Sequence, residues 1–285
     1  MDNQNAADAD TDELGQLNWI ISAFNLTSAA FIPAFGQFAD IFGRYWTMQV
    51  SGIIMILGSV LCAGAPTSNF PVLLAGRGIQ GVASAGILIL TKIILADKVS
   101  LKDNAKNNTI FTLVIGIGYG IGPVIGGYLT EVSWRWCFII DIPLAAIGVV
   151  LMHFVARPVL LGPQDLPTND EREKKVLSSA TFLQRVTTID IGGQLTFLFG
   201  MGLVVLALTW AGSYYPWSDA RVIAPLVIGV VLLLAFLVWE YLLLPGKVLA
   251  MRLPHQQAMI PLKLLWTRNA SVLMYINFIT GQGTS

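Results

Sequence analysis

An arginine within an apolar stretch is the residue of this sequence with the clearest capacity for chemistry. Arg77 is followed by Gln80, Gly81 and Ser84, and offsets of three, four and seven residues lie on one face of a helix. A guanidinium inside a membrane costs a few kcal/mol unless it faces a wet cavity or a partner. Snorkelling to the interface, the alternative, is only partly possible at this depth. Arg77 and Gln80 are therefore candidates for proton coupling, because a fixed positive charge favours the ionised form of a nearby acid or holds an anionic group.

The segment from Gly36 to Arg44 reads Gly-Gln-Phe-Ala-Asp-Ile-Phe-Gly-Arg and falls in a tight turn between two apolar runs. Gly36 and Gly43 permit close backbone approach and unusual dihedral angles. Asp40 can interact with a helix N-terminus, and Arg44 can pair with it or with a neighbouring carboxylate. Such a latch would hold one conformation and release it in another. An ordinary polar turn is the alternative.

A glycine-rich run lies near the middle of the sequence. Gly118, Gly122 and Gly126 repeat every four residues, which leaves one helix face without side chains, so that another helix can pack closely against it. Pro123 removes a backbone donor and bends the helix, and Gly127 extends the run. The pattern suits a helix that pivots while it seals against leakage, and static small-residue packing is the alternative.

Acidic and aromatic residues mark the ends of the later apolar runs. Trp134 and Trp136 predict an aromatic belt at the outer interface. Asp141 lies a few residues deeper. It either titrates in a wet vestibule, which makes it a further candidate for proton coupling, or caps the start of its helix.

Five other polar or reactive side chains are assigned no functional role. Asp190 lies at the start of one run and Glu240 near the end of another. Both are predicted at the interface on the side opposite to Trp134 and Trp136. His153, toward the same side, is predicted to be packed or interface-facing rather than a proton relay. Cys62 and Cys137 are predicted to be two separate thiols.

All of these residues belong to, or border, runs that are long enough to cross a bilayer, for which a helix needs about 20 residues. Hydrophobic residues make up 55% of the 285 residues and charged residues only 12%. Because the runs are continuous, the predicted fold class is an all-α, polytopic membrane protein. Seven spans are predicted, at 17–37, 47–65, 71–94, 110–130, 137–157, 190–210 and 220–244. An eighth span begins near Ser271.

The basic residues predict an orientation for these spans. All but Arg77, Arg135 and Arg221 of the 17 Lys and Arg residues fall on one side, which the positive-inside rule assigns to the cytoplasm. The zero net charge argues against nucleic acid as a partner, whereas the lipid bilayer is an expected one. The predicted parts are an acidic non-cytoplasmic tail (1–16), five helices (17–157), a cytoplasmic loop (158–189), two further transmembrane helices (190–244), a second cytoplasmic loop (245–270) and the start of another helix (271–285).

Together the motifs resemble the major facilitator superfamily, and within it the fourteen-span drug–proton antiporter family, the fungal branch most closely. The Gly36 to Arg44 segment is similar to the superfamily's loop motif after the second helix. The segment around Arg77 is similar to its fourth-helix motif, and the segment from Gly122 to Gly127 to its fifth-helix antiporter motif. Three motifs in order, on the corresponding spans and sides, make the resemblance specific.

The resemblance implies roles for several residues. Asp40 and Arg44 would make gating contacts on the cytoplasmic side, Arg77 would take part in proton coupling, and the glycine and proline helix would provide antiport-type packing. The spans at 190–210 and 220–244 would link the two halves of the transporter. The sequence also departs from the pattern, because Ile41 and Tyr45 replace basic residues and Asp141 stands where Asn is frequent.

By this resemblance the first visible span corresponds to the family's second, and the chain stops within the ninth. We therefore expect a partial chain, incapable of transport alone, with a missing or complementing transporter half as a partner. The expected function is proton-coupled efflux of small organic compounds such as drugs, toxins or secondary metabolites, with the proton gradient as energy source. No enzymatic activity, cofactor or metal is expected, and the plasma membrane is the expected location.

Two alternatives remain at this point: uptake or exchange of another solute such as a siderophore, and a non-transporting membrane fragment that associates with a full-length transporter. The sequence assigns no substrate-binding residues.

Overall fold

The computed structural model describes residues 2–66, 69–97, 100–161, 188–212, 214–244, 247 and 272, with side chains from Asn18 onward except those of Leu101 and Val159. In this part of the chain seven helices are long and apolar enough to cross a membrane, which confirms the all-α fold class. The main helices are α1 (Asp2–Phe42), α2 (Arg44–Gly64), α3 (Phe70–Ala96), α4 (Leu101–Val132), α10 (Ile191–Trp210) and α11 (Ala220–Leu242).

The remaining span is built from consecutive short helical pieces. These are α5 (Arg135–Ile139), α6 (Asp141–Leu151), a π-helical turn η1 (Met152–Ala156) and α7 (Arg157–Leu160). Single π turns inside α-helices occur frequently at functional sites, and this one holds His153.

Two helices are longer than their predicted spans. α1 begins at Asp2, so residues 2–16 of the predicted acidic tail are helical and continuous with the first span. α4 begins at Leu101 rather than near residue 110. The Ser100 side chain caps its start by accepting from the Asp103 amide. Hydropathy detects only the part of a helix that lies in lipid, whereas capped polar turns extend it further. The predicted loops 158–189 and 245–270 and the eighth span lie almost entirely outside the described residues.

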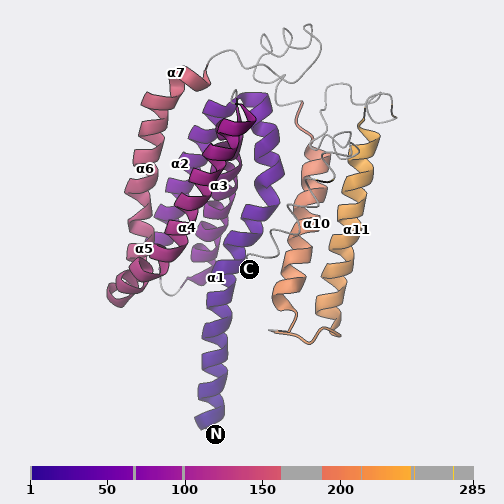
Figure 1. Ribbon diagram of the computed structural model, residues 1–285. Coiled ribbons are helices and arrows are strands. Elements are labelled where there is room, and N and C mark those ends of the chain that lie inside the picture. The colour runs from indigo at the N-terminus through magenta and orange to yellow at the C-terminus, as the bar shows by residue number, and fades with distance from the viewer. Residues whose placement is uncertain are drawn as a thin grey trace.

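The helices form two groups that lie side by side (Figure 1). α3 packs against both α1 and α2, and α6 packs against α2. α10 and α11 form an antiparallel pair that reaches the first group through α1. Close approach depends on glycine, since a Cβ on Gly58 of α2 would lie 2.9 Å from the backbone nitrogen of Gln80 in α3.

The contact between α1 and the α10–α11 pair is polar at one end, where Asp190 precedes α10 and Glu240 lies near the end of α11. Both side chains are fully buried. Oδ1 of Asp190 accepts from the Gly193 amide at 3.0 Å and from Nε1 of Trp239 at 2.9 Å. Asp190 is drawn inward because it caps α10 while it also binds α11, and burying such a group requires these partners.

The Gln37 side chain extends this cluster to α1. Its Oε1 accepts from the Asp190 amide at 3.4 Å and from Nε2 of Gln194 at 3.0 Å. At the other end of the pair, the rings of Trp19 and Trp210 meet edge to face with centroids 6.1 Å apart. The two contacts fix α10 to α1 near both of its ends.

Candidate functional site

Four polar side chains form a continuous hydrogen-bonded chain across α3, α2 and α6. Nη1 of Arg77 donates to Oε1 of Gln80 at 2.9 Å, and Nε2 of Gln80 donates to Oγ of Ser59 at 2.9 Å. Oγ of Ser59 lies 2.5 Å from Oδ2 of Asp141. The three predicted proton-coupling candidates Arg77, Gln80 and Asp141 are therefore joined in one network, and Ser59 is the residue that joins them.

The Arg77 guanidinium is enclosed by the other helices. Its Nε donates to the carbonyl of Ile20 at 3.3 Å, and its Cζ lies 4.5 Å from the ring centroid of Phe24 and 5.9 Å from that of Phe138. Aromatic faces stabilise a cation when water is excluded. Arg77 thus has partners within the span and does not depend on snorkelling.

Local helix packing explains why this network forms. Gly81 lies directly against the backbone carbonyl of Phe24 and the hydroxyl of Thr27, which brings α3 against α1 beside Arg77. Ser59 is completely buried and Gln80 is 3% exposed, so their hydrogen bonds are shielded from water. The N-terminus of α6 has no side-chain cap. Asp141 lies in the first turn of α6, and its carboxylate bonds to Ser59 rather than to a backbone amide.

The loop motif forms a one-residue connection between two helices. α1 ends at Phe42 and α2 begins at Arg44, and Gly43 between them adopts φ 87°, a conformation that favours glycine. Arg44 forms an ion pair with Asp97 at the end of α3 and also interacts electrostatically with Asp40, which is itself exposed. The latch partner is thus the neighbouring carboxylate, and Asp97 was missed because nothing in the sequence links it to the motif.

The predicted packing face of α4 is uncovered in the part of the chain that the structure describes. At Gly118, Gly122, Gly126 and Gly127 a Cβ would meet no atom within 4 Å. Pro123 lies inside this helix, which continues from Leu101 to Val132. Close packing against this face, which the sequence predicts, is therefore not provided by the described residues.

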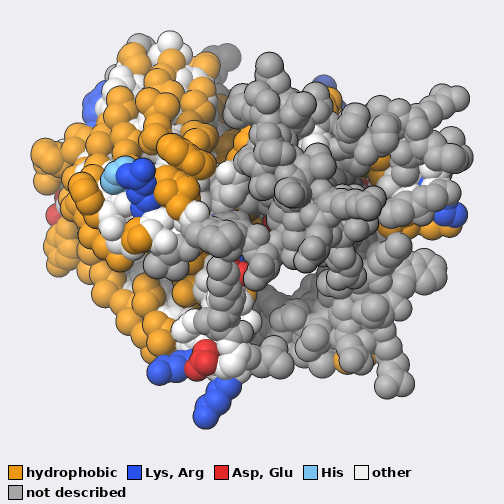
Figure 2. Space-filling model, turned by 90° about the horizontal axis from the view of Figure 1, so that it is seen from above, with side chains coloured by type: hydrophobic (Ala, Val, Ile, Leu, Met, Phe, Trp, Pro, Cys, Tyr) orange, Lys and Arg blue, Asp and Glu red, His pale blue; other side chains and the backbone are white. Residues whose placement is uncertain are grey.

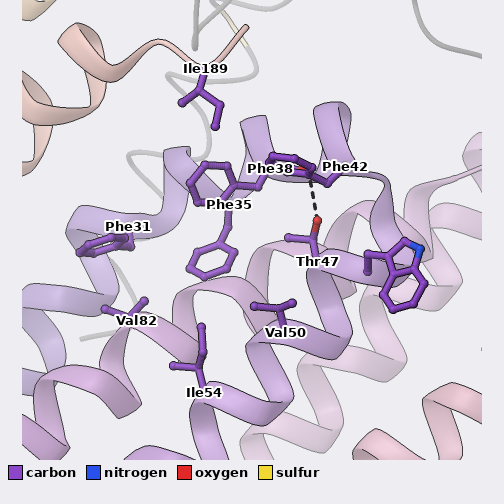
Figure 3. Close-up of a pocket in the computed structure, with 10 residues that line it drawn as sticks. Phe31, Phe35, Phe38, Phe42, Thr47, Val50, Ile54, Val82 and Ile189 are labelled. Atoms are coloured by element: carbon purple, nitrogen blue, oxygen red, sulfur yellow. Dashed lines mark hydrogen bonds between the residues drawn. The ribbon is translucent and has the colours of Figure 1, made fainter. Parts of the chain in front are cut away.

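Sequence reasoning also missed an apolar cavity of about 730 Å³ beside the loop motif. Figure 3 shows its α1 side chains above Val50 and Ile54 of α2, with Ile189 at the far edge. Thr47 and the indole of Trp46 contribute polar groups to its lining, and Oγ1 of Thr47 donates to the carbonyl of Phe38 at 3.1 Å. The available signal was the helical spacing of four phenylalanines on α1: Phe31, Phe35, Phe38 and Phe42.

A bundle of apolar helices that are each long enough to cross a bilayer defines a multi-pass membrane protein. The family model of the Major Facilitator Superfamily matches residues 8–283. The chain belongs to this superfamily, whose members are transporters.

Several fungal relatives match most of the chain. It is 36% identical to the MFS-type transporter gkaD of Penicillium citrinum, over 81% of this chain and 37% of that protein. It is 34% identical to the efflux pump FUS6 of Gibberella fujikuroi, over 92% of this chain and 42% of that protein. It is 34% identical to the MFS-type efflux pump LUC4 of a Fusarium species, over 94% of this chain and 43% of that protein. The chain thus spans about two fifths of the length of these curated relatives.

Proposed function

We propose that the chain takes part in proton-coupled efflux of small apolar or amphipathic organic compounds. The observation that carries this proposal is the network from Arg77 to Asp141, which places a carboxyl group and a guanidinium on one hydrogen-bonded path inside a membrane bundle. Ionisable residues within membrane spans commonly mark ion and proton pathways. The names of FUS6 and LUC4 as efflux pumps support export as the direction.

The hydroxyl of Ser59 gives the network two states. Its oxygen lies 2.5 Å from Oδ2 of Asp141 and 2.9 Å from the carbonyl of Met55, and its single proton can serve one acceptor at a time. When Asp141 is ionised, Ser59 donates to the carboxylate, and the bonds from Arg77 and Gln80 all point toward Asp141. When Asp141 is protonated, it donates to Ser59 and the hydroxyl turns to Met55. Proton binding thus reverses the direction of the hydrogen bond between α6 and α2.

The apolar cavity supports the substrate class. A volume of about 730 Å³ lies within the range of sites that bind drug-sized ligands, which are mostly lined by hydrophobic and aromatic side chains. Aromatic rings from α1 and one hydroxyl from Thr47 suit a compound with few polar groups. Drugs, toxins and secondary metabolites of this chemistry are the proposed substrates, and the plasma membrane is the proposed location.

Full transport is proposed to require a second transporter half. In the superfamily's alternating access, two halves rock about a site near the midplane. The bare glycine face of α4 supports this requirement, because a helix from the other half can pack closely there. The same face favours the alternative of a non-transporting chain that associates with a full-length transporter.

The test measures retention of an apolar fluorescent compound in yeast. The chain is expressed alone and together with the C-terminal part of a relative, with and without a proton uncoupler. Uncoupler-sensitive export is expected in the combined cells and should be lost in Asp141→Asn. Asp219→Asn serves as the matched control, since Asp219 caps α11 outside the network.

Each outcome discriminates between the proposals. Export that persists with the uncoupler would contradict proton coupling, and uncoupler-sensitive accumulation would favour uptake instead. Export by the chain alone would contradict the need for a second half. Association with the C-terminal part without any transport would favour the non-transporting alternative.

A further inference from the structure

We propose that Arg157 and His153, at the end of α6, bind the phosphate of an anionic membrane phospholipid. The two side chains line a shallow cavity of about 360 Å³ together with Phe154, Pro158 and Leu161. The cavity joins two cationic or donor groups with apolar walls. This is the combination that a lipid headgroup with attached acyl chains requires, and the site lies apart from the network and the aromatic cavity described above.

The position of the site corresponds to the membrane surface. The apolar span Arg135–Ala156 ends where the cavity begins. On the lipid side of this end, Phe154 is 75% exposed and Leu161 is 48% exposed. Viewed from this end, a histidine lies beside a basic side chain with hydrophobic side chains around both (Figure 2). Exposed apolar groups can therefore contact acyl chains while the guanidinium and the imidazole contact the headgroup.

The π-helical turn brings the two side chains to one face. In η1 the amide of Arg157 bonds to the carbonyl of Met152, five residues earlier. Because a π turn contains more residues than an α turn, side chains four to five positions apart align along the axis. His153 and Arg157 are four positions apart and line the same cavity.

Tyr45 orients the histidine from α2. Its hydroxyl lies 2.8 Å from Nδ1 of His153 and accepts from Nε2 of Gln49 at 3.4 Å. When the phenol, which accepts from the amide, donates its own proton to Nδ1, the imidazole proton lies on Nε2. Nε2–H is then a donor for a ligand. The tyrosine that replaces a basic residue in the loop motif thus gains a specific role, and its ring is 3% exposed.

The Arg157 guanidinium is available for such a ligand. Among the described residues it has no ion pair, whereas Arg44 on the same side of the bundle pairs with Asp97. A planar guanidinium binds phosphate oxygens through two parallel hydrogen bonds. Charge complementarity therefore selects a phosphate, and the exposed apolar walls select the lipid-linked form over a free anion.

The test is lipid retention by the purified full chain, measured by native mass spectrometry after titration with phosphatidylserine or phosphatidylcholine in detergent. One phosphatidylserine per chain is expected to bind in preference to phosphatidylcholine. Arg157→Gln should weaken this binding about fivefold, the effect of removing one interfacial cation. Tyr45→Phe and His153→Gln should also weaken it. Arg157→Lys should bind less tightly than the wild type and more tightly than Arg157→Gln, because the charge remains while the paired hydrogen bonds are lost.

Lys102→Gln is the matched control, since Lys102 is an exposed cation on the same side of the bundle. It should leave the single bound lipid unchanged. Equal losses in Arg157→Gln and Lys102→Gln, or no loss in either, would overturn the proposal, because the lipid would then respond to overall charge alone. Displacement of the lipid by an equal concentration of inorganic phosphate would also overturn it, by identifying a free anion as the ligand. If Arg157→Gln fails to fold, His153→Gln and Arg157→Lys decide the question.

Discussion

The contact between α1 and α3 beside Arg77 depends on the missing side chain of Gly81. In Gly81→Ala, the new methyl group would collide with the backbone carbonyl of Phe24 and the hydroxyl of Thr27. A backbone carbonyl in a helix cannot rotate away as a side chain can, so the two helices must separate. Overpacking of this kind costs about 1–3 kcal/mol.

Gly118→Ala provides the matched comparison. Gly118 also lies inside a helix, and a Cβ there would meet nothing within 4 Å. Both substitutions gain about 1 kcal/mol of helix propensity, which cancels between them. The difference of about 1–3 kcal/mol between the two variants therefore measures the collision alone.

The assay is thermal unfolding of the purified chain in detergent, followed by tryptophan fluorescence. For a protein of this size, about 1 kcal/mol corresponds to roughly 2–4 °C in the melting temperature. Gly81→Ala should unfold several degrees below Gly118→Ala, and Gly118→Ala at or above the wild type. Equal melting temperatures would refute the close approach of α1 and α3. A destabilised Gly118→Ala would show that the face of α4 is already covered in the isolated chain.

Four further predictions concern other parts of the structure. Ser59→Ala leaves Gln80 and Asp141 without their common partner and should lower the free energy of unfolding by about 1–3 kcal/mol. Ser84→Ala, on α3 outside the network, should leave it unchanged, and chemical denaturation measures both variants. Trp239→Phe removes the donor to the buried Asp190 oxygen and should cost about 1–3 kcal/mol, and an unchanged denaturation midpoint would contradict the polar contact between α10 and α11. Arg44→Gln breaks the partly exposed ion pair with Asp97 and should cost about 1 kcal/mol or less, a loss that high salt should reproduce in the wild type. Phe35→Ala should weaken binding of an apolar fluorescent probe to the cavity, measured by the probe's emission, while Phe199→Ala on the exposed face of α10 should not.

Sequence alone predicted the features that depend on local pattern. Hydropathy located all seven described spans, because the requirement for about 20 apolar residues acts on each segment separately. Helical periodicity placed Arg77 and Gln80 on one face, since their spacing fixes their direction whatever surrounds the helix. The unusual dihedral of Gly43 followed in the same way from the glycine at a tight turn.

Only the tertiary structure decided which faces meet. Ser59 is one of several small polar residues in its span, and only the packing of α2 between α3 and α6 makes it the link between Gln80 and Asp141. The partner of Arg44 and the enclosure of the aromatic cavity depend equally on helix arrangement. The sequence indicated that Asp190 lies near the end of its span, but its burial also depends on the hydrogen bond from Trp239 of α11, which is close to it only in space.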